Sequence, residues 1–374
     1  MLRFLTAGES HGPCLTAILD GMPAGLEVDL DVVDRDLQRR QGGYGRGDRM
    51  KIERDRVEVL GGILYSRTTG APIALRIENK DWANWRDRWA AGNLPKLTIP
   101  RPGHADYAGA VKYGVEDARL ISERASARET AARVAVGALA RQLLAEFDVA
   151  VGSFVTEIGG VPAEIPTCCH PELWSLAEAS DLRCPDDRAA ERMRRRIDAA
   201  REAGDSLGGV FAVTATGLPV GLGSHVQWDR RLDARLVAAV VSIPAIKGAE
   251  IGPAFHNAAL PGTQVHDEIH SDGQGGVARR TNRAGGFEGG MTNGMPVIVR
   301  AAMKPIPTTV SPLRSVDLET GERAETEYQR SDVCAVPAAS IVGEAMVAWT
   351  LADAMTEKLG GDSLGEMKDR YTAG

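Results

Sequence analysis

The segment that decides the fold most clearly is Ala338–Leu359, with the sequence AASIVGEAMVAWTLADAMTEKL. Apolar side chains recur in it at helical spacing and form a stripe that consists of Val342, Ala345, Met346, Trp349 and Ala352. Two glycines, Gly360 and Gly361, follow directly and are typical of a helix end. The segment therefore predicts a long helix whose apolar stripe packs in the core.

Two other stretches also predict helices, at about Ser122–Phe147 and Pro185–Gly204. Short apolar runs predict strands at Val57–Leu60, Ile73–Ile77, Val210–Ala215 and Val297–Ala302. Strands and helices do not alternate along the chain as they do in a doubly wound fold. The expected class is therefore α+β, with antiparallel sheets packed on helices in a single large domain over residues 1–374.

Composition narrows the class of protein. The chain has 374 residues, of which 43% are apolar and 25% are charged, as in ordinary globular proteins. The net charge of −7 argues against nucleic acid as a partner, and the odd number of cysteines, 5, argues against a disulfide framework. The start lacks the apolar core of a signal peptide, and no stretch reaches the roughly 20 apolar residues of a membrane span. We expect a soluble, cytoplasmic protein.

Two glycine-containing motifs near the N-terminus suit chemistry on anions. Gly8–Pro13 reads GESHGP and presents His11 on a turn, where an imidazole can exchange a proton near neutral pH. The alternative is a capping turn in which Ser10 and His11 satisfy only backbone groups. Arg39–Arg49 reads RRQGGYGRGDR after a predicted helix, and its guanidinium groups suit phosphate or carboxylate. A solvated basic loop is the alternative for this second motif.

Two further motifs place an ionisable group beside an arginine. Arg101–Tyr107 reads RPGHADY, in which proline and glycine fix the backbone just before His104. Any tight turn would look similar. Arg330–Pro337 reads RSDVCAVP and precedes the last predicted helix, with Asp332 as its acidic group. The alternative role for Asp332 is an N-terminal helix cap.

The motif Glu123–Thr130, ERASARET, opens the first predicted helix. Arg124 and Arg128 are four residues apart and would share a helix face. Ser126 would cap the helix, whose N-terminal N–H groups favour an anion. The alternative is a surface ion-pair face that includes Glu129.

A glycine-rich loop, Arg283–Gly294, is followed by a strand and then by Lys304–Thr308, KPIPT. This order suits a cradle for a phosphate or a flat cofactor. The GxxxxGK[ST] pattern is absent from the sequence, which excludes a nucleotide-hydrolysing P-loop.

Two clusters resemble metal sites, but neither has the spacing of one. His266 and His270 are four residues apart, yet glycine-rich flanks make the helix that zinc would need doubtful. Cys168–His170 contains adjacent cysteines instead of a CxxC pair, which favours buried or idle thiols. We expect no metal ion.

Taken together and in order, the motifs resemble those of the chorismate synthase family. They are GESHG, RRQGGYGRG, RPGHADY, ERASARET, AIKGAEIG, TNRAGGFEGGMTNG and RSDVCAVPA. The resemblance covers about residues 1–362, and the remaining C-terminal residues are expected to be a flexible tail. The resemblance implies a β-α-β sandwich and a homotetramer.

The resemblance also implies a reaction. The substrate would be 5-enolpyruvylshikimate 3-phosphate, which loses its 3-phosphate and the C6 hydrogen in a 1,4-elimination that gives chorismate, within aromatic amino acid biosynthesis. FMN would have to be reduced, although the reaction has no net redox change. An external flavin reductase would supply the reduced FMN, with NADPH as an indirect reductant.

Individual roles follow from the same resemblance. His11 would be the general acid for the leaving phosphate, His104 would protonate or stabilise the reduced flavin, and Asp332 would act with flavin N5 in taking the C6 hydrogen. The residues that would bind substrate are Ser10, Arg40, Arg46, Arg101 and Arg128. The residues that would contact FMN are Arg124, Ala125, Ser126, Pro244, Ala245, Gly289, Lys304, Pro305, Ile306, Pro307, Thr308 and Arg330.

Two positions depart from the family pattern. Pro244 stands where many members have glutamine, and Ser331 stands where some have histidine before the aspartate. Neither departure removes a residue that the resemblance assigns to the chemistry. Two other functions remain as alternatives: a flavin-binding protein that has lost turnover, and an NAD(P)-linked reductase, for which the sequence has no dinucleotide fingerprint.

Overall fold

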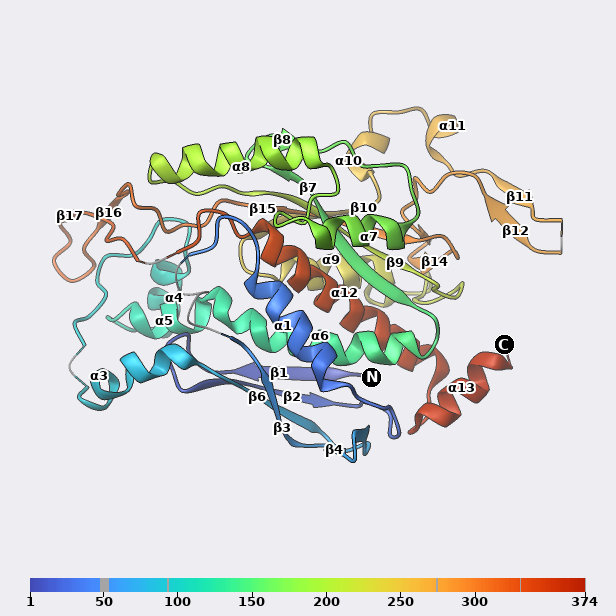
Figure 1. The fold of residues 1–374 in the computed structure, drawn as a ribbon, viewed down its shortest axis with the longest axis horizontal. Coiled ribbons are helices and arrows are strands. Elements are labelled where there is room, and N and C mark those ends of the chain that lie inside the picture. The colour runs from blue at the N-terminus through green and yellow to red at the C-terminus, as the bar shows by residue number, and fades with distance from the viewer. Residues whose placement is uncertain (48–53, 93, 274, 330, 374) are drawn as a thin grey trace.

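The computed structural model of the chain describes residues 1–47, 54–92, 94–273, 275–329 and 331–373. Two antiparallel sheets enclose a layer of helices, as Figure 1 shows, and one hydrophobic core runs through all three layers. This arrangement confirms the expected class of mixed sheets and helices and the β-α-β sandwich that the family resemblance implied.

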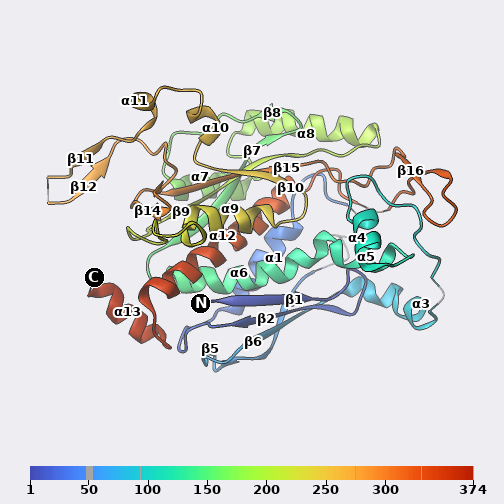
Figure 2. The ribbon, with the colours of Figure 1, turned by 180° about the vertical axis from the view of Figure 1, so that it is seen from behind.

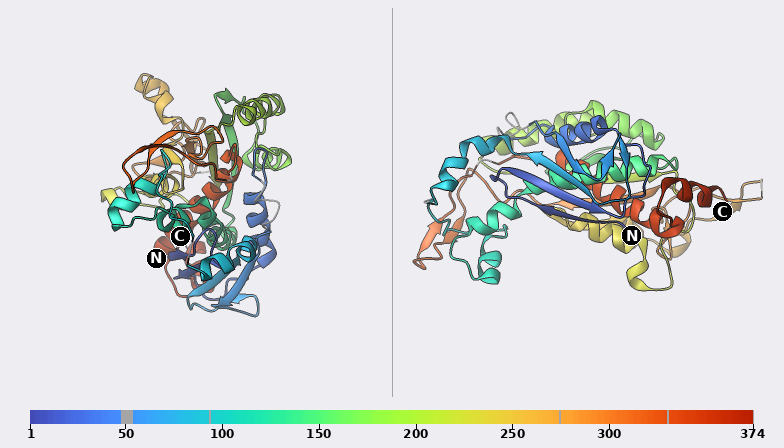
Figure 3. Two further views of the ribbon diagram at one scale, coloured as in Figure 1. Left: turned by 90° about the vertical axis from the view of Figure 1, so that its left-hand side faces the viewer. Right: turned by 90° about the horizontal axis from the view of Figure 1, so that it is seen from below.

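The first sheet has the strand order β1-β2-β6-β3. Its strands are β1 (Arg3–Ala7), β2 (Cys14–Asp20), β6 (Ile73–Glu78) and β3 (Val57–Gly61). Alternate side chains such as Leu19 and Leu75 point into the core, because successive residues of a strand face opposite sides of the sheet. The other face carries Leu5 and Ile18, paired across β1 and β2, and both are exposed. In the view from below in Figure 3, these strands face the viewer.

The second sheet has the strand order β10-β15-β9-β7-β8. Its strands are β10 (Ile246–Ile251), β15 (Val297–Met303), β9 (Gly209–Thr216), β7 (Ala150–Ile158) and β8 (Val161–Pro162). The outer face of this sheet is covered by α7 (His170–Ala179) and α8 (Asp187–Glu202), as the upper part of Figure 1 shows. Three predictions are therefore confirmed, with ends that differ by no more than two residues. They are the strands at Val210–Ala215 and Val297–Ala302 and the helix at Pro185–Gly204.

The helical layer consists of α1 (Leu30–Gln41), α6 (Thr130–Ala145), α9 (Leu232–Val241) and α12 (Val336–Leu359). Helix α12 confirms the predicted long helix, but it is buried on nearly all sides because it lies between the two sheets. Small residues let α6 and α12 cross closely, and a Cβ atom added at Gly137 would lie 2.3 Å from the Cβ atom of Ala345. The apolar stripe alone did not predict this complete burial.

The remaining elements are short. In the first half of the chain they are β4 (Ile63–Leu64), β5 (Arg67–Thr68), η1 (Lys80–Asn84), α3 (Arg86–Ala90), α4 (Asp106–Tyr113), α5 (Arg119–Ala125) and η2 (Ala127–Glu129). In the second half they are η3 (Trp228–Arg230), α10 (Ala254–Asn257), α11 (Gly262–Val265), β11 (Ile269–Ser271), β12 (Val277–Arg279), β13 (Phe287–Glu288), β14 (Met291–Thr292), β16 (Arg314–Val316), β17 (Arg323–Glu325) and α13 (Leu364–Thr372). Helices α3, α4 and α5 gather with β16 at one end of the sandwich, at the left in Figure 1 and at the right in Figure 2.

Two expectations about helices were wrong. The helix expected from Ser122 to Phe147 is interrupted, because Ser126 is extended (φ −65°, ψ 141°) and separates α5 from η2 and α6. The residues after 362, expected to be a tail without structure, form α13. Its Leu364 and Met367 are buried, and the Leu364 N–H donates to the carbonyl oxygen of Ala24 at 2.9 Å.

Within the described residues, none of the helices combines the length and the apolar character that crossing a bilayer requires.

Candidate active site

A cavity of about 770 Å³ lies where α5, η2 and the start of α12 meet the loops around residues 101–105 and 303–308. It is lined by most of the residues that the sequence singled out: Ser10, His11, Arg40, Arg46, Arg101, His104, Ala125, Ser126, Arg128, Pro244, Ala245, Lys304, Ile306, Pro307, Thr308 and Asp332. These residues come from segments far apart in the chain, and the fold brings them to one place.

His11 lies on the turn that follows β1, and Glu123 of α5 holds it there. The backbone N–H of His11 donates to Glu123 Oε2 at 2.8 Å, and the ring Nδ1 lies 2.8 Å from Glu123 Oε1. The indole of Trp85 packs against the imidazole, with ring centroids 4.3 Å apart. Burial alone would raise the pKa of Glu123, but the hydrogen bonds from His11 outweigh burial and lower that pKa. A charged carboxylate is therefore in contact with His11 at neutral pH.

His104 has a carboxylate partner of its own. Its Nδ1 lies 2.6 Å from Asp106 Oδ1, and Arg101 binds the same carboxylate through Nε at 2.8 Å and Nη2 at 3.0 Å. Burial would raise the pKa of Asp106, but the hydrogen bonds from His104 and Arg101 hold it well below its ordinary range. Arg101 also donates to Gln329 Oε1 and Ser122 Oγ, so protein groups already engage most of its N–H groups.

Arg40 and Arg128 meet over one buried carboxylate. Arg40 Nη2 and Arg128 Nη1 donate to the same oxygen, Asp55 Oδ2, at 3.0 and 2.6 Å. Burial lowers the pKa of Arg40 to about 10, with Asp55 opposing that effect and Arg128 adding to it. The Nε atom of Arg40 is buried and has no hydrogen-bond partner among the described residues. The cluster keeps excess positive charge beside the cavity, which suits an anionic ligand.

Asp332 is paired with the glycine-rich motif and does not cap a helix. Arg46 Nη1 donates to Asp332 Oδ2 at 2.5 Å, and the backbone N–H of Gly47 donates to Oδ1 at 2.7 Å. The N-cap residue of α12 is Ala335, which makes no side-chain cap hydrogen bond. The capping role considered for Asp332 is therefore wrong, and both its carboxylate oxygens are engaged by the motif around Arg46.

The segment Lys304–Pro307 forms one wall of the cavity where it leaves β15. The Lys304 N–H donates to the carbonyl oxygen of Ala245 at 3.0 Å, and Ala245 has a positive φ of 68°. A non-glycine residue in that conformation is strained, and such strain is found mostly at functional sites. Pro244 and Ala245 thus bring their backbone to the cavity through a fixed turn.

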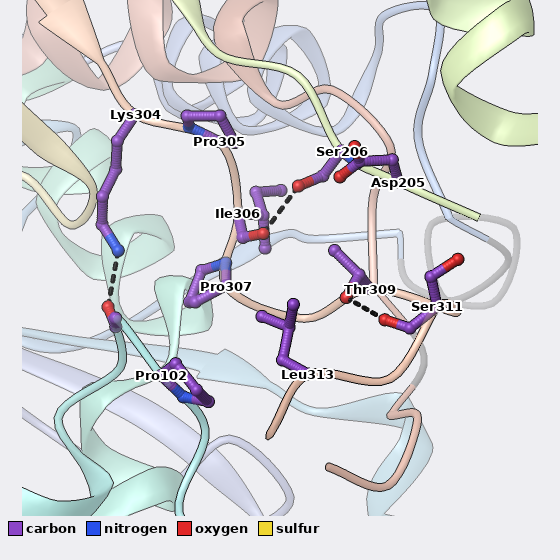
Figure 4. Close-up of a pocket in the computed structure, with 11 residues that line it drawn as sticks. Pro102, Asp205, Ser206, Lys304, Pro305, Ile306, Pro307, Thr309, Ser311 and Leu313 are labelled. Atoms are coloured by element: carbon purple, nitrogen blue, oxygen red, sulfur yellow. Dashed lines mark hydrogen bonds between the residues drawn. The ribbon is translucent and has the colours of Figure 1, made fainter. Parts of the chain in front are cut away.

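A second, smaller hollow of about 300 Å³ lies on the other side of this wall, shown in Figure 4. Pro305 lines that hollow and does not line the larger cavity. Lys304 Nζ donates to the carbonyl oxygen of Gly103 at 2.5 Å and ties the wall to the loop that carries His104. Burial and the nearby charge of Lys247 lower the pKa of Lys304.

Two further residues expected at the FMN site, Arg124 and Gly289, do not line the cavity. Arg124 is exposed and donates to the carbonyl oxygen and Oγ1 of Thr6, because the break at Ser126 turns it away from Arg128. The expected shared face of these two arginines is therefore wrong. Gly289 lies in the turn between β13 and β14, outside the cavity lining. Arg330 lies outside the described residues.

The sequence reasoning missed the partners of the functional groups. Glu123 lies in the motif ERASARET and Asp106 in the motif RPGHADY, but neither was assigned a role. Asp55 lies in none of the motifs. Trp85 and Arg119 also line the cavity. The role of Asp106 could have been predicted from its position two residues after His104, because a short side chain there reaches the ring of that histidine.

The two clusters that resembled metal sites do not form one. His266 follows the end of α11, and His270 lies in strand β11, so the two do not share a helix. Cys168 is half-buried and Cys169 is exposed, and both are free thiols. Of the two expected alternatives, buried or idle thiols, a fully buried pair is therefore wrong, and idle thiols stay a prediction. Among the described residues, no group of three or more metal-ligating side chains is found.

Comparison with known proteins agrees with this geometry. The family model described as chorismate synthase matches residues 2–356. Chorismate synthase of Desulforamulus reducens is 59% identical over 376 residues, which cover 99% of this chain and 97% of that protein. Chorismate synthase of Geobacter sulfurreducens is 55% identical over 383 residues, which cover 99% of this chain and 98% of that protein. A solved crystal structure of chorismate synthase matches with a TM-score of 0.81 and 45% identity, over 100% of this chain and 96% of the other. The chain belongs to the chorismate synthase family.

Proposed function

We propose that the protein is a lyase that converts 5-enolpyruvylshikimate 3-phosphate to chorismate, with reduced FMN bound beside the substrate. The 3-phosphate and the C6 hydrogen leave in a 1,4-elimination, and the reaction has no net redox change. The observation that carries this proposal is that His11, His104 and the arginine cluster line one cavity. A substrate with a phosphate and carboxylates requires such a cluster.

The residues of the cavity fit a flavin beside an anionic substrate. Its volume of about 770 Å³ lies within the range of ligand pockets. One wall is apolar and includes Ile243, Ala245, Met303, Ile306 and Val342, which suits a flat ring. The lining also includes Arg40 and Arg128, with an unpartnered buried Nε on Arg40. When bound, a reduced isoalloxazine supplies electron density to the allylic system as phosphate leaves.

In the proposed reaction, the chain's own groups bind anions and move protons. Arg40, Arg46 and Arg128 hold the phosphate and carboxylates and stabilise the charge that builds on the departing phosphate. His11 donates a proton to that phosphate through the ring nitrogen that Glu123 leaves free. His104 also lines the cavity, and we assign it to the flavin. We assign the FMN contacts to the lining residues Ala125, Ser126, Pro244, Ala245, Lys304, Ile306, Pro307 and Thr308.

Asp332 is proposed to accept the C6 hydrogen as a proton, while the electron pair of the broken C–H bond enters the new double bond and the phosphate leaves with the electron pair of its C–O bond. Both of its oxygens are engaged by Arg46 and Gly47. When the substrate binds, Arg46 would move from Asp332 to the substrate anion, which would free one carboxylate oxygen for C6. The pairing of these two groups thus supports roles for both in the same step.

The experiment that tests the function supplies chemically reduced FMN and 5-enolpyruvylshikimate 3-phosphate to the purified protein without oxygen. Chorismate should form, and its absence from folded protein would overturn the proposal. The same protein should oxidise NADPH only slowly in air with FMN present, because an external flavin reductase supplies the reduced cofactor, with NADPH as its indirect source. Rapid oxidation would favour the reductase alternative.

We further propose that the protein works in the cytoplasm as a homotetramer. The exposed apolar side chains Leu5, Ile18 and Leu60 on the outer face of the first sheet support burial of that face in an assembly. Light scattering on the purified protein tests the assembly, and a monomer at micromolar concentration would contradict it.

A further inference from the structure

Glu123 holds the turn that carries His11 at three points. Its carbonyl oxygen accepts from the Ser10 N–H at 3.0 Å, Oε2 accepts from the His11 N–H at 2.8 Å, and Oε1 lies 2.8 Å from the Nδ1 atom of the His11 ring. The Glu123 side chain is only 8% exposed. Because a buried carboxylate is costly unless it is paired, these contacts bind Glu123 and the His11 turn closely together.

The pairing decides which nitrogen of a neutral His11 ring carries the proton. An ionised carboxylate can only accept hydrogen bonds, and contact with His11 lowers the pKa of Glu123 against the opposing effect of burial. Nδ1 must therefore be the donor to Oε1. Nε2 is then left as the nitrogen available to a ligand, and the ring lines the cavity.

The ring is held from a second side by Trp85. The two ring centroids are 4.3 Å apart with an interplanar angle of 33°, and the guanidinium of Arg88 lies over the Trp85 ring, 4.8 Å from its centroid. A rotation that turned Nδ1 toward the cavity would break the bond to Glu123 and disturb this stack. Glu123 pairs with the ring and Arg88 lies over Trp85. The other titratable or charged residues that line the cavity are Arg40, Arg46, Arg101, His104, Arg119, Arg128, Lys304, Glu327 and Asp332.

We propose that Glu123 is the positioning residue of His11, which keeps a proton on Nδ1 in both the neutral and the protonated ring. Nε2 therefore faces the leaving group of the substrate, and the protonated ring donates to it from that nitrogen. The catalytic part of this inference rests on the proposed function, whereas the position of the proton does not. The role matches that of a carboxylate that orients a catalytic histidine without itself exchanging a proton.

The variant Glu123→Gln separates this role from simple filling of space. Glutamine has nearly the same size but only one acceptor oxygen, together with an NH₂ group that can only donate. It faces two donors of His11, the backbone N–H and Nδ1–H, and cannot accept from both. If the amide oxygen stays on the backbone N–H, its NH₂ group meets Nδ1, and the ring proton moves to Nε2.

The first measurement is ¹⁵N NMR of histidine-labelled protein without substrate, at alkaline pH where the rings are neutral. The His11→Ala variant identifies the His11 signal among the 7 histidines. We expect Nδ1–H in the wild type and in the control Glu116→Gln, whose carboxylate pairs with Lys96 at the surface, and Nε2–H in Glu123→Gln. A wild-type ring protonated at Nε2 would overturn the inference, whether or not the variants fold.

The second measurement is turnover under anaerobic conditions with reduced FMN. We expect Glu123→Gln to lower kcat by roughly 10²-fold or more with KM little changed, because a neutral amide no longer stabilises the protonated ring that donates from Nε2 to the leaving group. Glu123→Asp keeps the charge and should recover part of the loss, and Glu116→Gln should match the wild type. A wild-type kcat in Glu123→Gln would overturn the inference. Absence of chorismate from the wild type would instead overturn the proposed function and leave the NMR assignment standing.

Discussion

Asp55 illustrates how a single buried residue sets the charge of the cavity. One of its oxygens accepts from both Arg40 and Arg128. Burial alone would raise the pKa of Asp55, but Arg128 and Arg40 outweigh burial and lower that pKa. Two guanidinium groups against one carboxylate leave one unit of positive charge. That surplus is what an incoming phosphate or carboxylate can neutralise.

Replacing Asp55 by asparagine should destabilise the protein and make its stability depend on anions. Loss of the carboxylate leaves two buried arginines uncompensated, which typically costs about 3–5 kcal/mol. Added phosphate should restore part of that loss by binding the arginines of the folded state. Urea unfolding with and without phosphate measures both effects, with Glu58→Gln, an exposed partner of Arg76, as the control. Equal unfolding midpoints for Asp55→Asn and Glu58→Gln would contradict the prediction.

His11 and His104 should each be required for turnover and dispensable for binding FMN. Both rings are held by carboxylates and line the cavity, so His11→Ala and His104→Ala should each lower kcat on the order of 10²–10⁴-fold while flavin binding persists. His256 is exposed in α10, so His256→Ala is the matched control. Rates like the wild type in both cavity variants would show that the histidines are wrongly assigned.

At the scale of elements, the crossing of α6 and α12 depends on the absence of a side chain at Gly137. A Cβ atom there would lie 2.3 Å from the Cβ atom and 2.4 Å from the Cα atom of Ala345, so the helices would have to move apart. Overpacking of this kind typically costs about 1–3 kcal/mol, which should exceed the gain of roughly 1 kcal/mol in helix propensity. Gly137→Ala should therefore lower the urea midpoint.

The control for this prediction is Gly61→Ala in β3. An added Cβ atom meets nothing within 4 Å there, so the midpoint should change little. If both alanine variants unfolded at the wild-type midpoint, the close crossing of α6 and α12 would not be a constraint on the fold.

The helices and strands that could be predicted from the sequence are those in which many apolar residues repeat at one spacing. Helix α12 and strands β3, β6, β9 and β15 have runs of apolar side chains at one spacing, and their positions were predicted within two residues. The break at Ser126 was not predicted, because helical spacing continues on both sides of it. Helix α13 was also missed, because two buried residues, Leu364 and Met367, are too few to show a period.

The part of the candidate site that could be predicted consists of residues that form local patterns in the sequence. Histidines and arginines in glycine-rich motifs stand out locally, and the fold brings most of them to one cavity. Two of the carboxylate contacts join residues that lie far apart in the chain: Asp55 is 73 residues from Arg128, and Glu123 is 112 residues from His11. Contacts over such separations depend on how the chain folds as a whole and leave no local pattern in the sequence.

Across the whole molecule, a buried ion network joins the helical layer to the second sheet. Glu344 in α12 is 1% exposed, and its carboxylate accepts from Arg39 of α1 at 2.8 Å and from Arg183 at 2.9 Å. Ser153 in β7 donates to the same carboxylate at 2.7 Å. The network therefore ties α1, which carries Arg40 at the cavity, to α12 and to β7.

This network should make the protein sensitive to acid. Burial alone would raise the pKa of Glu344, but Arg39, Arg183 and Arg141 together lower it from 4.5 to about 2. A carboxylate whose pKa is lower in the folded state stabilises that state fully above its unfolded pKa, and the contribution disappears as the pH falls through the folded pKa. The stability carried by Glu344, roughly 3 kcal/mol by this linkage, should thus be lost between about pH 4.5 and pH 2.

Urea unfolding as a function of pH tests the role of Glu344. The wild-type free energy of unfolding should fall steadily below about pH 4.5, together with the contributions of Asp55, Asp106 and Glu123, whose pKa values are also lowered. Glu344→Gln should be less stable at pH 7, because Arg39 and Arg183 lose their buried counter-charge, and its stability should fall less steeply in acid, because the titrating group is gone. A variant with the wild-type slope between pH 4.5 and pH 2 would show that Glu344 is not among the groups that couple folding to protons, and that the arginines around it are compensated by Asp36 and Glu178 instead.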